Sequence, residues 1–382
     1  MSPEARDDAY VQDARDDADL QNARDDARRR LDAYWARGCA FLGTRYALMG
    51  GAMSWVSERN LVAAISNAGG FGVVACGSLE PDQLGDEIDG VYERCDKPFG
   101  VNIIVMHPAL DALIATCIER GVGHVVLAGG MPPRRAIAAL KEAGTRVIAF
   151  APTLPLARRL AGQGIDALII EGMEAGGHIG PVSTNVLAQE VLPHFDEVPV
   201  FVGGGIGRGD AVALYLAMGA AGCQLGTRFV CATESIAHPR FKQAMIRANA
   251  RDARLSVQVD PDFPVIPVRA VANKATERFE AFQRETIARF RGGEMALAEA
   301  RLAIEHFWAG ALRRAAIEGD IENGSLMAGQ SVGMVSAEQS TEEIVTELVG
   351  QAVNAIASSA ERGTGAAAED DRPSRPPLPA TA

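Results

Sequence analysis

Short apolar runs alternate with amphipathic stretches through the middle of the chain. Eight of these runs have the length of buried strands, and they lie at residues 46–49, 72–75, 100–105, 124–128, 146–151, 167–170, 199–202 and 222–225. Helical patterns separate them, for example at 58–67 and 154–164. Alternating strands and helices predict a parallel sheet, and eight such units predict a closed (β/α)8 TIM barrel of the α/β class.

An open, doubly wound sheet is the alternative architecture. The run Gly-Gly-Gly-Ile-Gly-Arg-Gly at 203–209 invites comparison with the dinucleotide-binding fingerprint G-x-G-x-x-G. No register of the run satisfies that fingerprint, because the last position is Arg208 when it starts at Gly203 and Asp210 when it starts at Gly205. The run also follows a late strand instead of the first one. The barrel is therefore favoured.

The two ends of the chain depart from the alternating pattern. Ala-Arg-Asp-Asp-Ala occurs at 5–9, 14–18 and 23–27, and this spacing turns successive copies to opposite sides of a helix. Residues 1–36 are therefore expected to form a solvated helix or to be disordered. We expect the barrel in residues 37–255, a helical cap domain beside its mouth in 256–361, and a disordered tail in 362–382.

Composition narrows the class of protein. Of the 382 residues, 48% are hydrophobic, and the formal net charge of −12 disfavours nucleic-acid binding. No apolar run reaches the length of a membrane span, and the N-terminus lacks the apolar core of a secretory signal. The six cysteines form no CxxC pair, which argues against a zinc site or a disulfide framework. We expect a cytoplasmic protein without a membrane partner, for which a homodimer is a plausible assembly.

The richest chemical signal is Glu-Gly-Met-Glu-Ala-Gly-Gly-His-Ile-Gly at 171–180, directly after the sixth strand. Glycines such as Gly176 and Gly177 let the backbone approach a ligand closely. His178 is the only side chain of this stretch that moves a proton near neutral pH, and it is the candidate catalytic residue. Glu171 and Glu174 flank the glycines, and Glu171 is a candidate for cofactor binding. No second histidine stands at ligand spacing, so we expect no metal.

Glycines also follow the seventh and eighth strands, where barrels often bind phosphate through backbone N–H groups. Gly204 and Gly205 end the seventh strand, and Gly226 with Thr227 ends the eighth. Barrel loops are often rich in glycine for structural reasons alone. However, two such loops at adjacent strand ends together predict a phosphate site.

Residues at other strand ends are further candidates for cofactor contacts. Gly51 and Met53 follow the first strand, where the backbone can lie against a planar ring. Asn102, in the third strand, carries an amide that both donates and accepts hydrogen bonds. The alternative role for Asn102 is a structural amide bonded to a neighbouring strand. Thr153 ends the fifth strand.

Taken in order, these motifs resemble those of the nitronate monooxygenase (2-nitropropane dioxygenase) family. The resemblance rests on Gly-Ala-Met-Ser at 51–54, Ser-Asn-Ala-Gly-Gly-Phe-Gly at 66–72, Gly-Val-Asn at 100–102 and the glycine loops described above. The stretch 171–180, Glu-Ser at 234–235, His-Pro at 238–239 and Met-Ala-Gly-Gln at 327–330 are most similar to the flavin-dependent enoyl-acyl-carrier-protein reductase branch. The resemblance implies FMN, with its phosphate at the seventh and eighth strands, Asn102 and Thr153 near the flavin, and His178 facing the substrate.

The resemblance implies an FMN-dependent oxidoreductase that oxidises nitronates or nitroalkanes with O2. The alternative is an NAD(P)H-dependent flavin reductase of enoyl-acyl-carrier-protein or quinone substrates. A third hypothesis, a flavin-binding barrel without turnover, is disfavoured because His178 and the glycine loops are all present.

Overall fold

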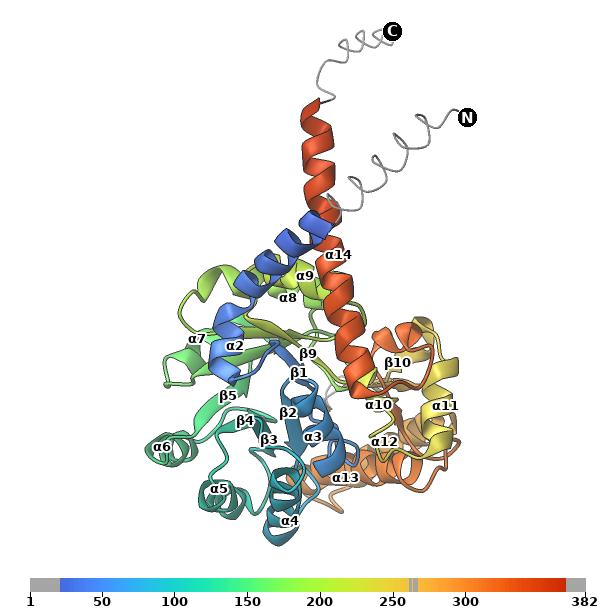
Figure 1. Cartoon of the computed structure of the whole chain (residues 1–382). Helices are drawn as coiled ribbons and strands as arrows, with labels where there is room; N and C mark the ends of the chain where they lie inside the picture. Colours follow the sequence, from blue (N-terminus) through green and yellow to red (C-terminus); the bar gives the residue numbers. More distant parts are fainter. Residues whose placement is uncertain (1–20, 261–262, 264–266, 369–382) are drawn as a thin grey trace, which may run out of the picture.

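The computed structural model describes residues 21–260, 263 and 267–368, and it confirms the barrel (Figure 1). Its eight parallel strands lie within a residue or two of the predicted runs: β1 Leu48–Gly50, β2 Gly72–Ala75, β3 Phe99–Ile104, β4 His124–Ala128, β5 Arg146–Phe150, β6 Ala167–Glu171, β8 Val200–Gly203 and β9 Gly222–Leu225. Their order is β1-β9-β8-β6-β5-β4-β3-β2. The barrel closes between β1 and β2, where Phe71 N–H donates to Leu48 O at 2.8 Å and Gly50 N–H to Phe71 O at 2.9 Å.

Helices follow the strands and cover the barrel from outside (Figure 1). Seven of them connect one barrel strand to the next: α3 Arg59–Asn67, α4 Pro81–Tyr92, α5 Leu110–Glu119, α6 Arg134–Glu142, α7 Leu154–Ala161, α8 Thr184–Val191 and α9 Gly209–Ala217. The eighth position is taken by α14, Thr341–Ala368, which packs against α9 and α3. The α9 contact is close, because a Cβ on Gly209 would lie 1.8 Å from Leu348 O. The expected cap of 256–361 therefore differs from the structure at its end, where α14 completes the barrel.

The cap is inserted between β9 and α14, and it contains a small sheet that the sequence analysis did not predict. Two long helices, α12 Lys274–Arg291 and α13 Leu297–Ala316, pack around a core of their own that includes Phe279 and Trp308. Beside them lies an antiparallel sheet of β10 Ala253–Leu255, β11 Val268–Val271, β12 Leu326–Met327 and β7 Gly177–His178. The rest of the insertion is formed by α10 Thr227–Val230, α11 Pro239–Arg247 and two 3-10 helices, η2 Ala250–Asp252 and η3 Gln330–Met334.

The N-terminal segment differs from the expected solvated or disordered extension. Residues 21–34 are helical and lead into α2 Ala36–Leu42. Ala27, Leu31 and Trp35 are each at most 1% exposed, and all three join the main core. They recur every four residues and so share one face of the helix. Of the three, only Ala27 belongs to a copy of the nine-residue repeat. The first two copies of the repeat, like residues 369–382 of the expected tail, lie outside the described residues.

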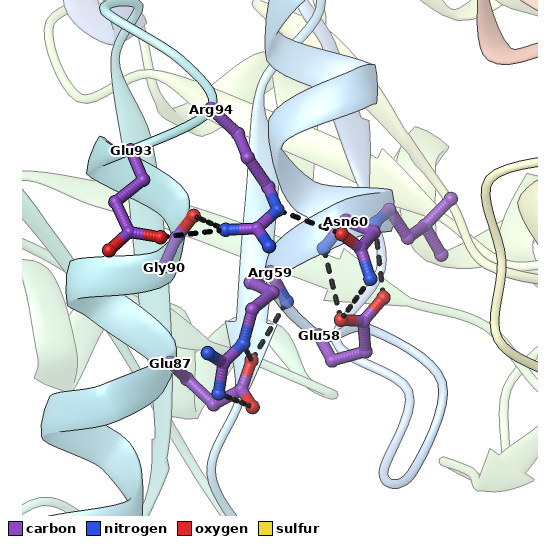
Figure 2. Close-up of polar contacts among 8 residues, drawn as sticks. Glu58, Arg59, Asn60, Glu87, Gly90, Glu93 and Arg94 are labelled. Atoms are coloured by element: carbon purple, nitrogen blue, oxygen red, sulfur yellow. Dashed lines mark hydrogen bonds and ion pairs between the residues drawn. The ribbon is translucent and has the colours of Figure 1, made fainter.

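A polar network joins α3 to α4 on the outside of the barrel (Figure 2). Glu58 caps α3 by accepting the N–H groups of Asn60 and Leu61. Arg59 Nη2 forms an ion pair with Glu87 Oε1 of α4 at 2.7 Å. Arg94 Nε donates to Asn60 Oδ1 at 2.9 Å. These bonds fix the start of α3 and therefore the end of the loop that follows β1.

Candidate functional site

The loops after β8 and β9 lie side by side, because these two strands are neighbours in the barrel. Four backbone N–H groups in these loops donate to no acceptor among the described residues, namely those of Gly204, Gly205, Gly226 and Thr227. Backbone N–H groups inside proteins nearly always find a partner. Four unpaired donors at two adjacent strand ends are what an anionic group such as a phosphate needs.

Local packing explains the two glycines after β8. Both have left-handed backbones, with φ of 98° at Gly204 and 72° at Gly205. A Cβ on Gly204 would lie 2.9 Å from Thr184 Oγ1, and one on Gly205 would lie 2.9 Å from the Cβ of Glu174. Thr184 Oγ1 also bonds Glu174 Oε2 at 2.9 Å and Gly204 O at 3.0 Å. Glu174 thus holds the loop in shape.

A segment of the cap contacts both the loop after β6 and the loop after β9. Gly329 N–H donates to Thr227 Oγ1 at 2.9 Å, and Gln330 N–H donates to Glu174 O at 2.9 Å. The backbone of Gly176 comes so close that a Cβ on it would lie 2.6 Å from Ala328 C. The sequence placed residues 327–330 among the family motifs but gave no sign of this contact, because it joins positions far apart in the chain.

The loop after β1 lies against the loop after β9. A Cβ on Gly51 would lie 3.2 Å from the Cα of Gly226, and Met53 Sδ would lie 3.6 Å from a Cβ on Gly226. The structure therefore brings four of the predicted residues together: Gly51, Met53, Gly226 and, through its neighbour, Thr227.

Asn102 and Thr153 have structural partners at their predicted strand positions. Asn102 is 8% exposed, and its Nδ2 donates to Val126 O of β4 at 3.1 Å, which is the structural role considered as the alternative. This bond leaves the Oδ1 of the amide without a partner among the described residues. Thr153 caps α7 by accepting Leu156 N–H at 3.4 Å.

Glu171 ends β6, and its acidity is strongly altered. Part of its surface remains accessible, yet protein atoms surround its carboxyl group. Burial raises the pKa of Glu171 to about 7, and the hydrogen bond from Gln224 Nε2 at 3.3 Å only partly opposes that rise. A carboxyl group with this pKa exchanges its proton near neutral pH.

His178 belongs to β7, which pairs with β11 of the cap so that His178 lies opposite Val268. Its side chain is exposed. The neighbouring pair, Gly177 and Arg269, faces the other side of the small sheet. Arg269 is 4% exposed, and its Nε donates to Met173 O at 2.9 Å, so this buried guanidinium ties the cap to the loop that carries His178.

Neither a metal cluster nor a membrane helix is found in the part of the chain that the structure describes. No group of three or more His, Cys, Asp or Glu side chains is placed to hold a metal ion there. Over the same residues, every helix is too short or too polar to cross a bilayer.

Comparisons with known proteins agree with this architecture. FabK from Thermotoga maritima is 34% identical, with a TM-score of 0.75 over 86% of this chain and 98% of its own. A (3aS,4S,5R,7aS)-5-hydroxy-7a-methyl-1-oxo-octahydro-1H-indene-4-carboxyl-CoA dehydrogenase from Mycobacterium tuberculosis is 30% identical over 82% of this chain and 94% of its own. Nitronate monooxygenase from Paraburkholderia phytofirmans is 28% identical over 62% of this chain and 76% of its own.

The family profile described as nitronate monooxygenase matches residues 37–351, which covers the barrel, the cap and the first part of α14. These relatives indicate an oxidoreductase. By this match, the chain belongs to the nitronate monooxygenase family.

Proposed function

We propose that this protein is an FMN-dependent oxidoreductase. The observation that carries the proposal is the set of four unpaired N–H groups at Gly204, Gly205, Gly226 and Thr227. They fit the phosphate of FMN, and the loop with Gly51 and Met53 lies beside them for the ring system. When bound, FMN would supply the electron-transfer chemistry, while the protein would position the substrate and handle protons.

The cofactor proposal predicts that Thr227→Val weakens FMN binding by about tenfold, because one donor to the phosphate is lost. Thr227 Oγ1 accepts from Gly329 N–H, which leaves its own proton available to the phosphate. The measurement is flavin retention and the dissociation constant for FMN after reconstitution. Thr116→Val is the matched control, since Thr116 Oγ1 bonds Ala112 O within α5, far along the chain from these loops. A protein that releases FAD, or that holds no flavin, contradicts the proposal.

The first candidate reaction is the oxidation of nitronates or nitroalkanes with O2. A nitronate is a stabilised carbanion that gives up electrons readily. His178 would hold this anion, or would take the proton from the neutral nitroalkane as a general base. The side chain is suited to both roles because it is exposed and lies on the glycine loop after β6.

A second candidate, the NAD(P)H-dependent reduction of an enoyl thioester or a quinone, is favoured by a specific observation. FabK, an enoyl-ACP reductase, is 34% identical, and the mycobacterial carboxyl-CoA dehydrogenase is 30% identical, whereas the nitronate monooxygenase is 28% identical. Here His178 would deliver a proton to the reduced carbon chain.

One anaerobic experiment separates the two candidates. The FMN-loaded protein is mixed separately with propyl nitronate, NADH and NADPH, and the flavin absorbance is followed. Bleaching by the nitronate alone supports the first candidate, and bleaching by a nicotinamide alone supports the second. If none of the three reduces the flavin, both candidates are contradicted.

Glu171 gives the site a stability signature that depends on pH. A carboxyl group whose pKa rises from about 4.5 to about 7 on folding makes folding take up a proton, so stability falls as pH rises through that window. The loss approaches roughly 3 kcal/mol above pH 7. Glu171→Gln resembles the protonated form, so the apo variant should melt several degrees above the apo wild type at pH 8 and close to it at pH 4. A difference in melting temperature between Glu171→Gln and wild type that is the same at pH 4 and at pH 8 would contradict the pKa shift.

A further inference from the structure

Trp55, in the loop after β1, has a strained backbone. Among the described residues it is the only one other than glycine with a positive φ, 65°. The left-handed region is unfavourable for a bulky residue, and such strain concentrates at ligand sites. The loop is held in this shape by Ser57, whose Oγ donates to Gly51 O at 2.8 Å and accepts Met53 N–H at 3.0 Å.

The indole N–H of Trp55 is also unusual. Its Nε1 is buried and has no hydrogen-bond partner among the residues that the structure describes. Trp35, by contrast, donates its Nε1 proton to Asp32 Oδ1 at 3.3 Å. A buried donor without an acceptor lowers stability, so its retention needs an explanation. One explanation is an acceptor that a bound ligand brings.

The position of Trp55 fits that explanation. Its loop lies between the loop after β9, which Gly51 approaches, and the loop after β2, where Ser54 Oγ would lie 3.7 Å from a Cβ on Gly77. From the cap, the guanidinium of Arg313 on α13 lies over the Trp55 ring, 5.6 Å from its centroid. Trp55 therefore stands between the mouth of the barrel and the cap, at the end of the barrel where such folds bind their substrates.

We propose that Trp55 is a substrate-binding residue, whose ring walls the site and whose indole N–H donates to an acceptor oxygen of the substrate. This inference rests on the proposed function. Both candidate substrates carry such an oxygen, in the nitronate group or in the thioester carbonyl. Because the N–H is covered, the indole turns or the cap helix shifts as the substrate enters, and a change of the Trp55 backbone would relieve its strain.

The test is Trp55→Phe, which keeps an aromatic ring and removes only the donor. FMN content should equal that of the wild type, because the phosphate loops are unchanged. The KM for the substrate that reacts, propyl nitronate or crotonyl-CoA with NADH, should rise about tenfold or more, since one hydrogen bond is lost. The melting temperature of the apo variant should be equal or higher, because a buried donor without an acceptor has been removed.

Trp308→Phe is the matched control. Trp308 Nε1 is likewise buried and finds no partner within the described part of the chain, but its side chain belongs to the core of the cap. This control should leave KM unchanged. Equal KM values for wild type and Trp55→Phe overturn the inference, as does an equal rise in both variants.

Failure of the proposed function gives different results from failure of the role proposed for Trp55. Loss of FMN from the wild type contradicts the phosphate site. A wild type that holds FMN but reacts with neither probe contradicts the activity and the role of Trp55 together. A reactive wild type with an unaffected Trp55→Phe variant contradicts only the role of Trp55.

Discussion

Replacing His178 with Asn is expected to lower turnover by roughly 10²- to 10⁴-fold, the range for loss of a general acid–base group. FMN content should stay close to that of the wild type, because the phosphate loops follow β8 and β9, whereas His178 lies in β7. Pre-steady-state flavin reduction and flavin content measure the two effects separately.

The choice of substrate refines the role of His178. If it acts as a base, His178→Asn should slow neutral nitroalkanes far more than preformed nitronates, which have already lost the proton. An equal loss on both would assign it to binding the anion. His194→Asn, in the 3-10 helix after α8, is a suitable control because it lies outside the glycine loop. Kinetics unchanged by His178→Asn would reject any catalytic role.

Removal of residues 1–36 is expected to destabilise the protein severely. Leu31 is 0% exposed and Trp35 is 1% exposed, and the Trp35 ring packs 5.4 Å from the Tyr46 ring, between centroids. Truncation of a single buried Leu or Trp side chain costs about 2–5 kcal/mol, and marginal proteins lose their fold at such a cost. Soluble yield and melting temperature measure the effect.

Two milder changes define which part of the segment matters. A chain that begins at residue 21 should melt close to the full-length protein, because it keeps both buried side chains. Asp26→Ala should change stability by less than about 0.5 kcal/mol, since Asp26 is exposed and its ion pair is with Arg29 on the helix surface. Full stability of residues 37–382 would show that the N-terminal helix is dispensable.

The sequence predicted the barrel well, because buried parallel strands are continuous apolar runs whose spacing survives any detail of packing. It also located the two glycine loops, because a left-handed turn such as Gly204–Gly205 favours glycine. It failed for the N-terminal helix, where the repeat concealed the four-residue spacing of Ala27, Leu31 and Trp35.

The remaining features of the site depend on contacts that no local pattern records. The short strand β7 exists only because β11 pairs with it, and the two are far apart in the sequence. Likewise, the bond from Gly329 to Thr227 and the strained backbone of Trp55 follow from how the cap meets the barrel. The sequence predicted the residue types at the site but not these partners.

The late position of α14 has a consequence for biosynthesis. The last strand of the barrel, β9, ends at Leu225, but the helix that packs on α9 and α3 begins only at Thr341. The N-terminal helix meets that same helix, since Arg24 Nη2 donates to Asn354 Oδ1 at 3.3 Å (Figure 1). On the ribosome, the apolar flank of α9 therefore stays uncovered until the final segment emerges. Such distant pairings slow folding and leave a nascent chain dependent on chaperones until synthesis ends.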